Sequence, residues 1–200
     1  MGGQKSKRTL FTVGHSTRTL DELVALLRAH RVAAVADVRL IPKSRRYPHF
    51  NAEALAVSLP ERGLDYMPFK SLGGRRRPLK DSPNMGWRNE SFRGYADYLA
   101  TDVFRKALTE LLSIASEVPT AIMCAEAVPW RCHRSLIGDA ALVRGWRVLD
   151  IMSEKSAPPH QLTKFAQVNG EQLTYPGETQ EELFELQSGS AADAEIKARE

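Results

Sequence analysis

Apolar runs and helix-spaced hydrophobic residues alternate along this chain. Residues 10–13, 32–38, 119–124 and 147–151 are short, nearly continuous apolar segments, which are typical of strands buried on both faces of a sheet. Between them, leucine, valine and alanine recur every three or four residues, the spacing of amphipathic helices. The alternation predicts an α/β fold: a mostly parallel sheet with helices on both faces, in a Rossmann-like three-layer arrangement.

Capping signals indicate where the helices begin. Thr19 and Glu22, three residues apart, form a capping-box pattern ahead of helix-spaced leucines. Asn51 is a candidate N-cap for a helix that ends near Gly63, and Asp102 is a candidate N-cap for a longer one. Helices are accordingly predicted over residues 20–27, 52–62, 92–99, 103–115 and 136–143.

A proline and a turn-rich stretch interrupt the alternation. Residues 65–69 form a predicted third strand, which Pro68 makes an edge or irregular strand. Residues 70–91 carry repeated glycine and proline turn signals, and a loop of this length in a compact domain is usually functional or mobile. A single α/β domain over residues 9–178 is therefore expected.

Charge is distributed unevenly between that domain and its ends. Residues 1–8 are expected to be a disordered basic arm and residues 179–200 a frayed or disordered acidic tail. The last 30 residues hold eight acidic and two basic side chains, and the rest of the chain carries a net charge of +10. A basic body favours an anionic ligand such as phosphate, a nucleotide or nucleic acid, although a basic solvated surface has the same composition.

The composition also indicates the cellular compartment in which the protein is expected. The chain has no long apolar run that would span a membrane, and its charged N-terminus is not followed by the apolar stretch of a signal peptide. Two cysteines do not make a disulfide scaffold, which favours a reducing, cytoplasmic setting. We expect no membrane partner, and the sequence indicates neither a cofactor nor an oligomeric state.

Polar, chemically reactive residues follow the predicted strands. Because crossovers between parallel strands are right-handed, the loops after the strands emerge at one edge of the sheet, where ligands of open α/β sheets bind. The candidate site residues in these loops are His15, Ser16, Asp37, Arg39, Ser44, Arg45, Gly73, Gly74, Arg75, Cys124, Glu126, Arg131, Cys132, His133, Arg134 and Ser135.

Four of these residues are candidates for catalysis. Cys132 lies at the predicted start of a helix, where unpaired N–H groups and neighbouring cations would lower a thiol pKa and make it a nucleophile or redox thiol; it could equally be a small capping residue. Glu126 is a general acid/base or a counter-charge for arginines. His15 is a base or a loop former, and Asp37 orients His15 or forms a buried ion pair with an arginine.

The remaining loop residues are candidates for substrate binding. Helix starts and arginines bind anions, and glycines let a backbone approach a ligand closely. This set comprises Ser16, Arg39, Ser44, Arg45, Gly73, Gly74, Arg75, Arg131, His133, Arg134 and Ser135. The arginine pairs and triplets at 45–46 and 75–77, near Trp87, Phe92 and Tyr95, would also suit a nucleic-acid backbone, but a charge run is usually a solvated face.

The two cysteines permit other interpretations. Cys124 ends an apolar strand and is expected to be a packed core residue. With Cys132, His133 and Glu126 it could instead bind zinc or iron, although the spacing fits no common zinc signature. The segment is similar to the phosphate loop of cysteine phosphatases and sulfurtransferases, but its six residues between Cys124 and Arg131 exceed that motif by one.

Several separated motifs occur together in a characteristic order. They are Thr12-Val-Gly-His-Ser16, Asp37-Val-Arg39, Pro42-x-Ser44, Phe50-Asn51, Leu72-Gly-Gly74, Met123-Cys-Ala-Glu126, Pro129 and Cys132-His-Arg134. Over about residues 9–152 the chain closely resembles the family called domain of unknown function 488. The resemblance implies an α/β domain of bacteria and archaea and supports these motif positions, but it implies no activity.

Three hypotheses for function follow. The first is an enzyme that acts on a phosphate-bearing substrate, such as a nucleotide or nucleic acid, at the carboxyl edge of the sheet, with Cys132, Glu126, His15 and Asp37 as catalytic residues. The second is a non-enzymatic module that binds an anion or nucleic acid. The third is a metal or redox sensor built from Cys124, Cys132 and His133.

Overall fold

A parallel sheet forms the centre of the computed structural model, which describes residues 8–177. Its five strands lie in the order β3-β2-β4-β1-β5, and every adjacent pair is parallel. The strands are β1 (Thr9–Gly14), β2 (Ala34–Asp37), β3 (Asp65–Pro68), β4 (Thr120–Cys124) and β5 (Arg147–Ile151). The predicted parallel sheet is therefore confirmed, and β3, which contains Pro68, is an edge strand as expected.

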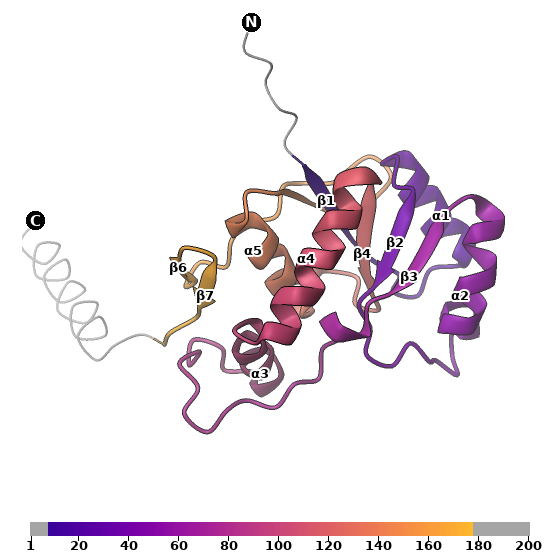
Figure 1. Cartoon of the computed structure of the whole chain (residues 1–200). Helices are drawn as coiled ribbons and strands as arrows, with labels where there is room; N and C mark the ends of the chain where they lie inside the picture. The colour runs from indigo at the N-terminus through magenta and orange to yellow at the C-terminus, as the bar shows by residue number, and fades with distance from the viewer. Residues whose placement is uncertain (1–7, 178–200) are drawn as a thin grey trace, which may run out of the picture.

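Helices cover both faces of this sheet (Figure 1). Buried residues of α1 and α2 pack in one apolar cluster, and those of α3, α4 and α5 pack in another on the opposite face. The helices are α1 (Leu20–Ala29), α2 (Ala52–Ser58), α3 (Glu90–Leu99), α4 (Asp102–Glu117) and α5 (Arg134–Val143), with short 3-10 turns η1 (Pro48–Phe50), η2 (Pro60–Arg62), η3 (Lys70–Leu72) and η4 (Pro129–Arg131). This is the expected three-layer α/β arrangement in one domain.

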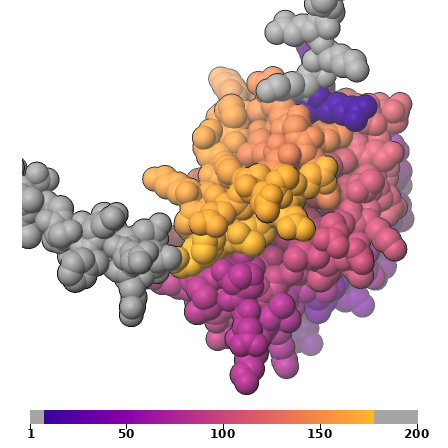
Figure 2. Space-filling view, turned by 60° about the vertical axis from the view of Figure 1, so that its left-hand side comes forward, coloured from indigo at the N-terminus to yellow at the C-terminus, as the bar shows by residue number. Residues whose placement is uncertain are grey.

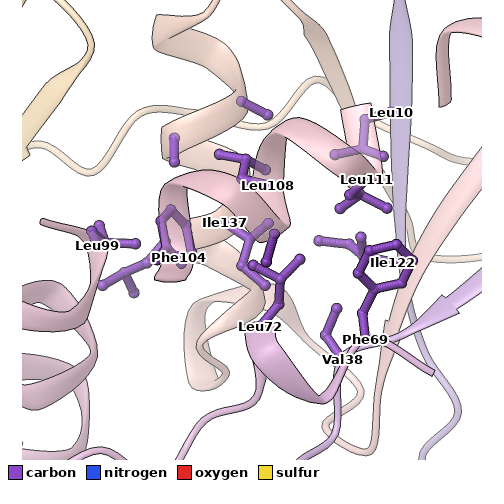
Figure 3. Packing of buried hydrophobic residues seen from close by; sticks show 14 of the residues in the cluster. Leu10, Val38, Phe69, Leu72, Leu99, Phe104, Leu108, Leu111, Ile122 and Ile137 are labelled. Carbon is purple, nitrogen blue, oxygen red and sulfur yellow. The ribbon is translucent and has the colours of Figure 1, made fainter. Parts of the chain in front are cut away.

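The larger of the two apolar clusters lies between the sheet and α4 (Figure 3). Leu10 of β1 and Ile122 of β4 point from the sheet toward Leu108 and Leu111 of α4, and all four side chains are fully buried. Leu72, from η3, fills the same layer near the carboxyl ends of the strands. The loops that follow the strands and carry the candidate site residues are thus supported by a close-packed apolar layer.

Local capping explains where several helices begin, and it corrects two predictions. The Thr19–Glu22 capping box is present, with each side chain bonded to the other residue's backbone N–H. Asn51 precedes α2, but its side chain accepts a hydrogen bond from the Ser44 N–H instead of capping the helix. Asp102 does not cap α4, because Thr101 accepts from the Phe104 N–H and is the N-cap.

The second predicted helix is also shorter than expected. It ends at Ser58, and residues 60–62 form the turn η2 instead, because Pro60 has no N–H to continue the helical ladder. Gly63 then reverses the chain with a left-handed φ of 73°, as its place at the predicted helix end suggested.

The segment after β5 packs back onto the domain. It contains the short antiparallel pair β6 (Gln167–Asn169) and β7 (Gln172–Thr174), which the weak sequence pattern did not predict. Figure 2 shows this yellow and orange segment lying across the surface against residues 70–90, drawn in magenta. Consistent with this view, the Gly86 N–H donates to the Tyr175 carbonyl at 2.9 Å.

A buried polar network fastens that segment to α5 and β5. The ring of His160 lies between two carboxylates, 2.9 Å from Asp150 and 3.1 Å from Asp139. Tyr175 donates to Asp139 at 2.9 Å, and Thr12 of β1 donates to Asp150 at 2.7 Å. The network therefore connects the centre of the sheet to the last described residues.

Two sequence expectations fall largely or wholly on residues whose structure is not described. The predicted basic arm, residues 1–8, lies outside the described range except for Arg8, and the predicted acidic tail, residues 179–200, lies outside it entirely. Among the helices of residues 8–177, none is long and apolar enough to cross a membrane.

Candidate functional site

The carboxyl ends of β1 and β4 lie at the point where the chain changes direction across the sheet. From β1 the chain runs through α1 to β2, whereas from β4 it runs through α5 to β5, on the other side of β1. The loops after these two adjacent strands consequently diverge. In open α/β sheets such a divergence creates the crevice in which ligands bind.

The two loops are joined by backbone hydrogen bonds that continue beyond the strands. The His15 N–H donates to the Cys124 carbonyl at 3.0 Å, and the Ser16 N–H donates to the Ala125 carbonyl at 2.9 Å. Gly14 permits this approach, because a Cβ there would lie only 1.8 Å from the Glu126 carbonyl oxygen. Ser16 follows with a left-handed φ of 52°, a conformation that costs free energy for a residue with a side chain.

Two thiols and an imidazole meet at this edge of the sheet. The Sγ atoms of Cys124 and Cys132 and a ring nitrogen of His133 all lie within 4.8 Å of one another. Cys124 comes from the end of β4, and Cys132 and His133 come from the turn that leads into α5. Both thiols are buried, with 8% of Cys124 and 4% of Cys132 exposed. We call these three residues the thiol cluster.

The backbone fixes which nitrogen of His133 faces the sulfurs. Nε2 lies 3.0 Å from the carbonyl oxygen of Val38, which can only accept, so Nε2 carries the hydrogen. In the neutral ring Nδ1 is then an acceptor, and in the protonated ring it is a donor that can stabilise a thiolate; it lies 3.6 Å from the Sγ of Cys132. The ring is further held by Tyr95, whose centroid is 4.9 Å away, and by Gly74, where a Cβ would lie 2.9 Å from Nδ1.

The pKa values of the two thiols are shifted in opposite directions. A hydrogen bond from the Cys132 thiol, helped by His133 and the charge of Arg134, lowers the pKa of Cys124 despite its burial. Donation of that hydrogen bond, together with burial, raises the pKa of Cys132. From the sequence, Cys132 was a candidate for either an activated thiol or a small capping residue, and Cys124 was expected to be packed. The helix start also bears on Cys132, because the Arg134 N–H donates to its Sγ at 3.5 Å, but this contact does not offset the rise.

Arg134 is buried beside the cluster with part of its guanidinium unpaired. Only 1% of the residue is exposed, and Nη2 donates to the Glu126 carbonyl at 3.1 Å. Among residues 8–177, neither Nε nor Nη1 has a hydrogen-bond partner. A buried cation with two unpaired N–H groups is costly unless an anion lies close to it. The guanidinium therefore suits a thiolate or an anionic group of a ligand.

A second polar cluster lies beside the thiols and is built around an ion pair. Arg39 contacts both carboxylate oxygens of Asp37, at 2.8 and 2.6 Å, and both residues are buried. Tyr66 donates to the same carboxylate at 2.7 Å, and Arg39 also donates to the Phe50 carbonyl at 2.8 Å. Of the two roles open to Asp37, this geometry favours the structural ion pair.

His15 belongs to the same cluster and has both ring nitrogens occupied. Nδ1 lies 3.0 Å from the Ser16 carbonyl and so donates, which leaves Nε2 to accept from Arg39 at 3.1 Å. The ring stacks on Phe50 at a centroid distance of 4.1 Å. Burial and the charge of Arg39 lower the pKa of His15 to about 4. The imidazole is thus held neutral, as a loop former would be.

The other predicted site residues divide into structural and exposed groups. The Ser44 hydroxyl accepts from the Tyr47 N–H, and the Ser135 hydroxyl donates to the Cys132 carbonyl, so both stabilise loops. Gly73 packs tightly against Leu40. The side chains of Glu126, Arg45, Arg75 and Arg131 are exposed to solvent.

Three contacts of the site had no signal in the sequence. The Val38 carbonyl that orients His133, the Tyr66 hydroxyl on Asp37 and the Phe50 ring under His15 each depend on which segments lie side by side. Tyr66 was recognisable only as a residue of a predicted strand, and Phe50 only as a motif position without a role. A backbone carbonyl is present at every position and cannot be singled out from residue types.

Comparison with known proteins gives one match. A family model described as "Domain of unknown function DUF488" matches residues 19–141. The matched span contains the thiol cluster, Arg134 and the Asp37–Arg39 pair, and it begins after His15 and Ser16. No curated protein and no solved structure matches the chain.

Proposed function

The chain belongs to the DUF488 family, and from its site we propose that it is an enzyme in which the Cys124 thiolate is the nucleophile toward an anionic substrate. Cys132 is the proton donor, His133 orients and polarises that thiol, and Arg134 holds the negative charge. His15, Asp37 and Arg39 support the loop on which the nucleophile stands. This assignment replaces Cys132 with Cys124 as the reacting sulfur and gives Glu126 no catalytic role.

One observation carries the proposal: a thiol cluster and a buried, partly unpaired guanidinium lie together at the carboxyl edge of the sheet, beside the ends of β1 and β4. A thiolate is the reactive form of cysteine, and positive charge and hydrogen-bond donors stabilise it. Cys124 has both, from Arg134 and from the Cys132 thiol. A merely packed cysteine would need neither.

The chemistry can be written with the residues of the cluster. The Cys124 thiolate gives an electron pair to the electrophilic atom of the substrate, and a covalent bond to sulfur forms. The bond to the leaving group breaks, and the leaving group departs with the electron pair of that broken bond and takes the proton of the Cys132 thiol. Water then attacks the adduct, which releases Cys124 as a thiolate and returns one proton to Cys132.

The substrate class follows from charge. Arg134 offers Nε and Nη1, and the chain outside its last 30 residues carries a net charge of +10. Guanidinium groups bind phosphate oxygens well because their N–H groups match the spacing of those oxygens. A phosphate-bearing substrate therefore fits this site better than a neutral one.

The proposal can be tested with a small thiol reagent. Methyl methanethiosulfonate at pH 7, followed by peptide mass spectrometry, should label Cys124 at least tenfold faster than Cys132 and faster than either thiol in urea-unfolded protein. Inorganic phosphate should slow the labelling of Cys124 more than sodium chloride of equal ionic strength, because phosphate competes for Arg134.

Matched variants distinguish an activated Cys124 thiolate from a thiol that is merely accessible to the reagent. Cys132→Ala removes the hydrogen-bond donor and should slow labelling of Cys124, whereas Ser113→Ala, on the exposed side of α4, should leave the rate unchanged. If Cys132 reacts first in the wild-type protein, or if Cys124 reacts no faster than an unfolded thiol, the proposed nucleophile is wrong.

A metal centre is a second candidate that one specific observation favours. Two thiolates and an imidazole nitrogen within 4.8 Å of one another match the donor types of zinc sites with three protein ligands and one open position. Titration with Co²⁺ would distinguish the candidates: a thiolate-to-cobalt absorption band that disappears in Cys132→Ser supports the metal site. Absence of that band, with rapid labelling of Cys124 in metal-free protein, supports the nucleophile.

A further inference from the structure

An apolar cavity of about 570 Å³ lies beside the first turn of α5. Its size falls within the range of sites for small molecules. It is formed by η4 on one side, by the segment 158–164 on another, and by Trp87 from the long loop. The lining residues with flat apolar surfaces are Trp87, Pro129, Trp130, Pro158 and Pro159.

This cavity adjoins the thiol cluster through the backbone of Cys132. The carbonyl oxygen of Pro129, which lines the cavity, accepts from the Cys132 N–H at 2.9 Å. The hydroxyl of Ser135, which also lines it, donates to the Cys132 carbonyl at 3.0 Å. The cavity and the thiol cluster therefore lie on two sides of one backbone segment, that of Cys132.

The lining is suited to a planar ring. Trp130 is 64% exposed although it is a large apolar side chain, so packing within the domain does not account for its position. Trp87 is stacked on Phe92 at 4.8 Å, and its Nε1 is buried with no hydrogen-bond partner among residues 8–177. An exposed indole offers a stacking face, and an unpaired indole N–H is a donor for an acceptor on the ligand.

The charges at the cavity favour an anion. Lys164 lines it and is exposed, and Arg131, next to Trp130 in the chain, is exposed as well. The acidic group in the lining, Asp150, is already engaged by Thr12 and His160. Positive charge beside stacking surfaces fits a ligand that joins an aromatic ring to a negative group.

We propose that this cavity binds the base of a nucleotide whose phosphate reaches the thiol cluster and Arg134. This inference names the substrate of the proposed Cys124 nucleophile, and as such it rests on the proposed function. The base stacks on Trp130, the cations at the rim attract the phosphate, and the backbone of Cys132 separates the two subsites.

Calorimetric titration of the full chain with adenosine monophosphate tests the proposal. Adenosine, which lacks the phosphate, and ribose 5-phosphate, which lacks the base, should each bind at least tenfold more weakly. Trp130→Ala should weaken adenosine monophosphate at least tenfold, since base–aromatic stacking is of that order per base. Val103→Ala is the control: Val103 is also an exposed apolar residue, but it lies on α4, away from the cavity lining, so this variant should leave the affinity unchanged.

Labelling of Cys124 separates the two proposals. Adenosine monophosphate should slow the labelling of Cys124 in the wild-type protein more than ribose 5-phosphate does. If adenosine monophosphate does not bind, or if Trp130→Ala binds it as well as the wild type, the cavity assignment is overturned while rapid labelling of Cys124 still stands. Slow labelling of Cys124 together with Trp130-dependent binding would instead remove the nucleophile and leave a nucleotide-binding site.

Discussion

His15 accepts a hydrogen bond at Nε2 from the Nη1 of Arg39, at 3.1 Å, while its Nδ1 lies 3.0 Å from the Ser16 carbonyl. The imidazole beside the thiol cluster is therefore a fixed neutral ring between a cation and a carbonyl. It supports the loop after β1, and it has no free nitrogen with which to take a proton from a substrate.

His15 should stay neutral far below the usual range of histidine. Because burial and Arg39 lower its pKa to about 4, the ring should keep its proton on Nδ1 from pH 8 down to about pH 5. Long-range ¹H–¹⁵N correlation spectra report the tautomer directly. Protonation of His15 near pH 6.5 would contradict the assignment.

Asp37→Asn should destabilise the protein by about 3–5 kcal/mol, because it leaves the buried guanidinium of Arg39 without its counter-charge. The free energy of unfolding in urea measures the loss. Asp21→Asn is the matched control, since Asp21 is paired with Arg62 at the surface and should cost much less. Equal losses in the two variants would show that burial of the Asp37 pair is unimportant.

Gly14→Ala should disrupt the contact between the loops that follow β1 and β4. The new Cβ would stand 1.8 Å from the Glu126 carbonyl oxygen, so the loop after β4 must move away and its hydrogen bonds with His15 and Ser16 must break. A loss of more than about 2 kcal/mol is expected from thermal or urea unfolding. Thr17→Ala, at an exposed position of the same loop, should be nearly neutral.

Gly74→Ala should change thiol reactivity without touching a sulfur. The added Cβ would lie 2.9 Å from Nδ1 of His133, so the ring must shift away from its present position beside Cys132. Labelling of Cys124 by methyl methanethiosulfonate should slow severalfold while the unfolding midpoint changes little. Ser71→Ala, exposed in the preceding turn, should label at the wild-type rate; a wild-type rate in Gly74→Ala would remove His133 from the mechanism.

Loss of the His160 proton should lower the free energy of unfolding at alkaline pH. Although burial lowers it, the hydrogen bonds that the ring donates to Asp139 and Asp150 raise the pKa of His160 to about 9. Because the folded protein holds this proton more tightly than the unfolded chain, where the pKa of histidine is about 6.5, the proton stabilises the fold fully below pH 6.5. That contribution disappears as the pH rises through about 9. Up to about 3 kcal/mol of the free energy of unfolding should be lost between pH 6.5 and 10.

The matched variant for this effect is His160→Gln, which keeps a donor but cannot titrate. Urea unfolding of both proteins across that pH range would show a steeper decline in the wild type. Parallel declines in the two proteins would mean that the network around His160 does not bind an extra proton in the folded state.

The layers of the fold could be predicted from the sequence because they depend on local pattern. Buried parallel strands and amphipathic helices leave periodic signals, and the capping box at Thr19 is confirmed in both of its hydrogen bonds. Where similar capping residues compete, local pattern is insufficient: Thr101 and Asp102 are adjacent, and only the backbone path decides between them. The pair β6–β7 was missed because its strands have only three residues each.

The site could be located from the sequence, but the acidity of its groups could not. The parallel order of the strands brings the loops to one edge, so the neighbourhood of Cys124 and Cys132 followed from topology. Which sulfur carries the charge depends on distances between side chains from separate elements, namely Cys132, His133 and Arg134 around Cys124. Similarly, residue types alone left Asp37 and His15 with two roles each.

The strand order has a consequence for anyone who expresses part of this chain. β1 lies between β4 and β5 and is hydrogen-bonded to both, yet β1 and β5 fall outside the matched span of residues 19–141. A fragment cut to that span would leave the β1-facing edge of β4 unpaired along its full length, in a strand whose residues are all buried in the full domain. Such an edge is a template for aggregation, so the shortest fragment that stays soluble should extend through Tyr175.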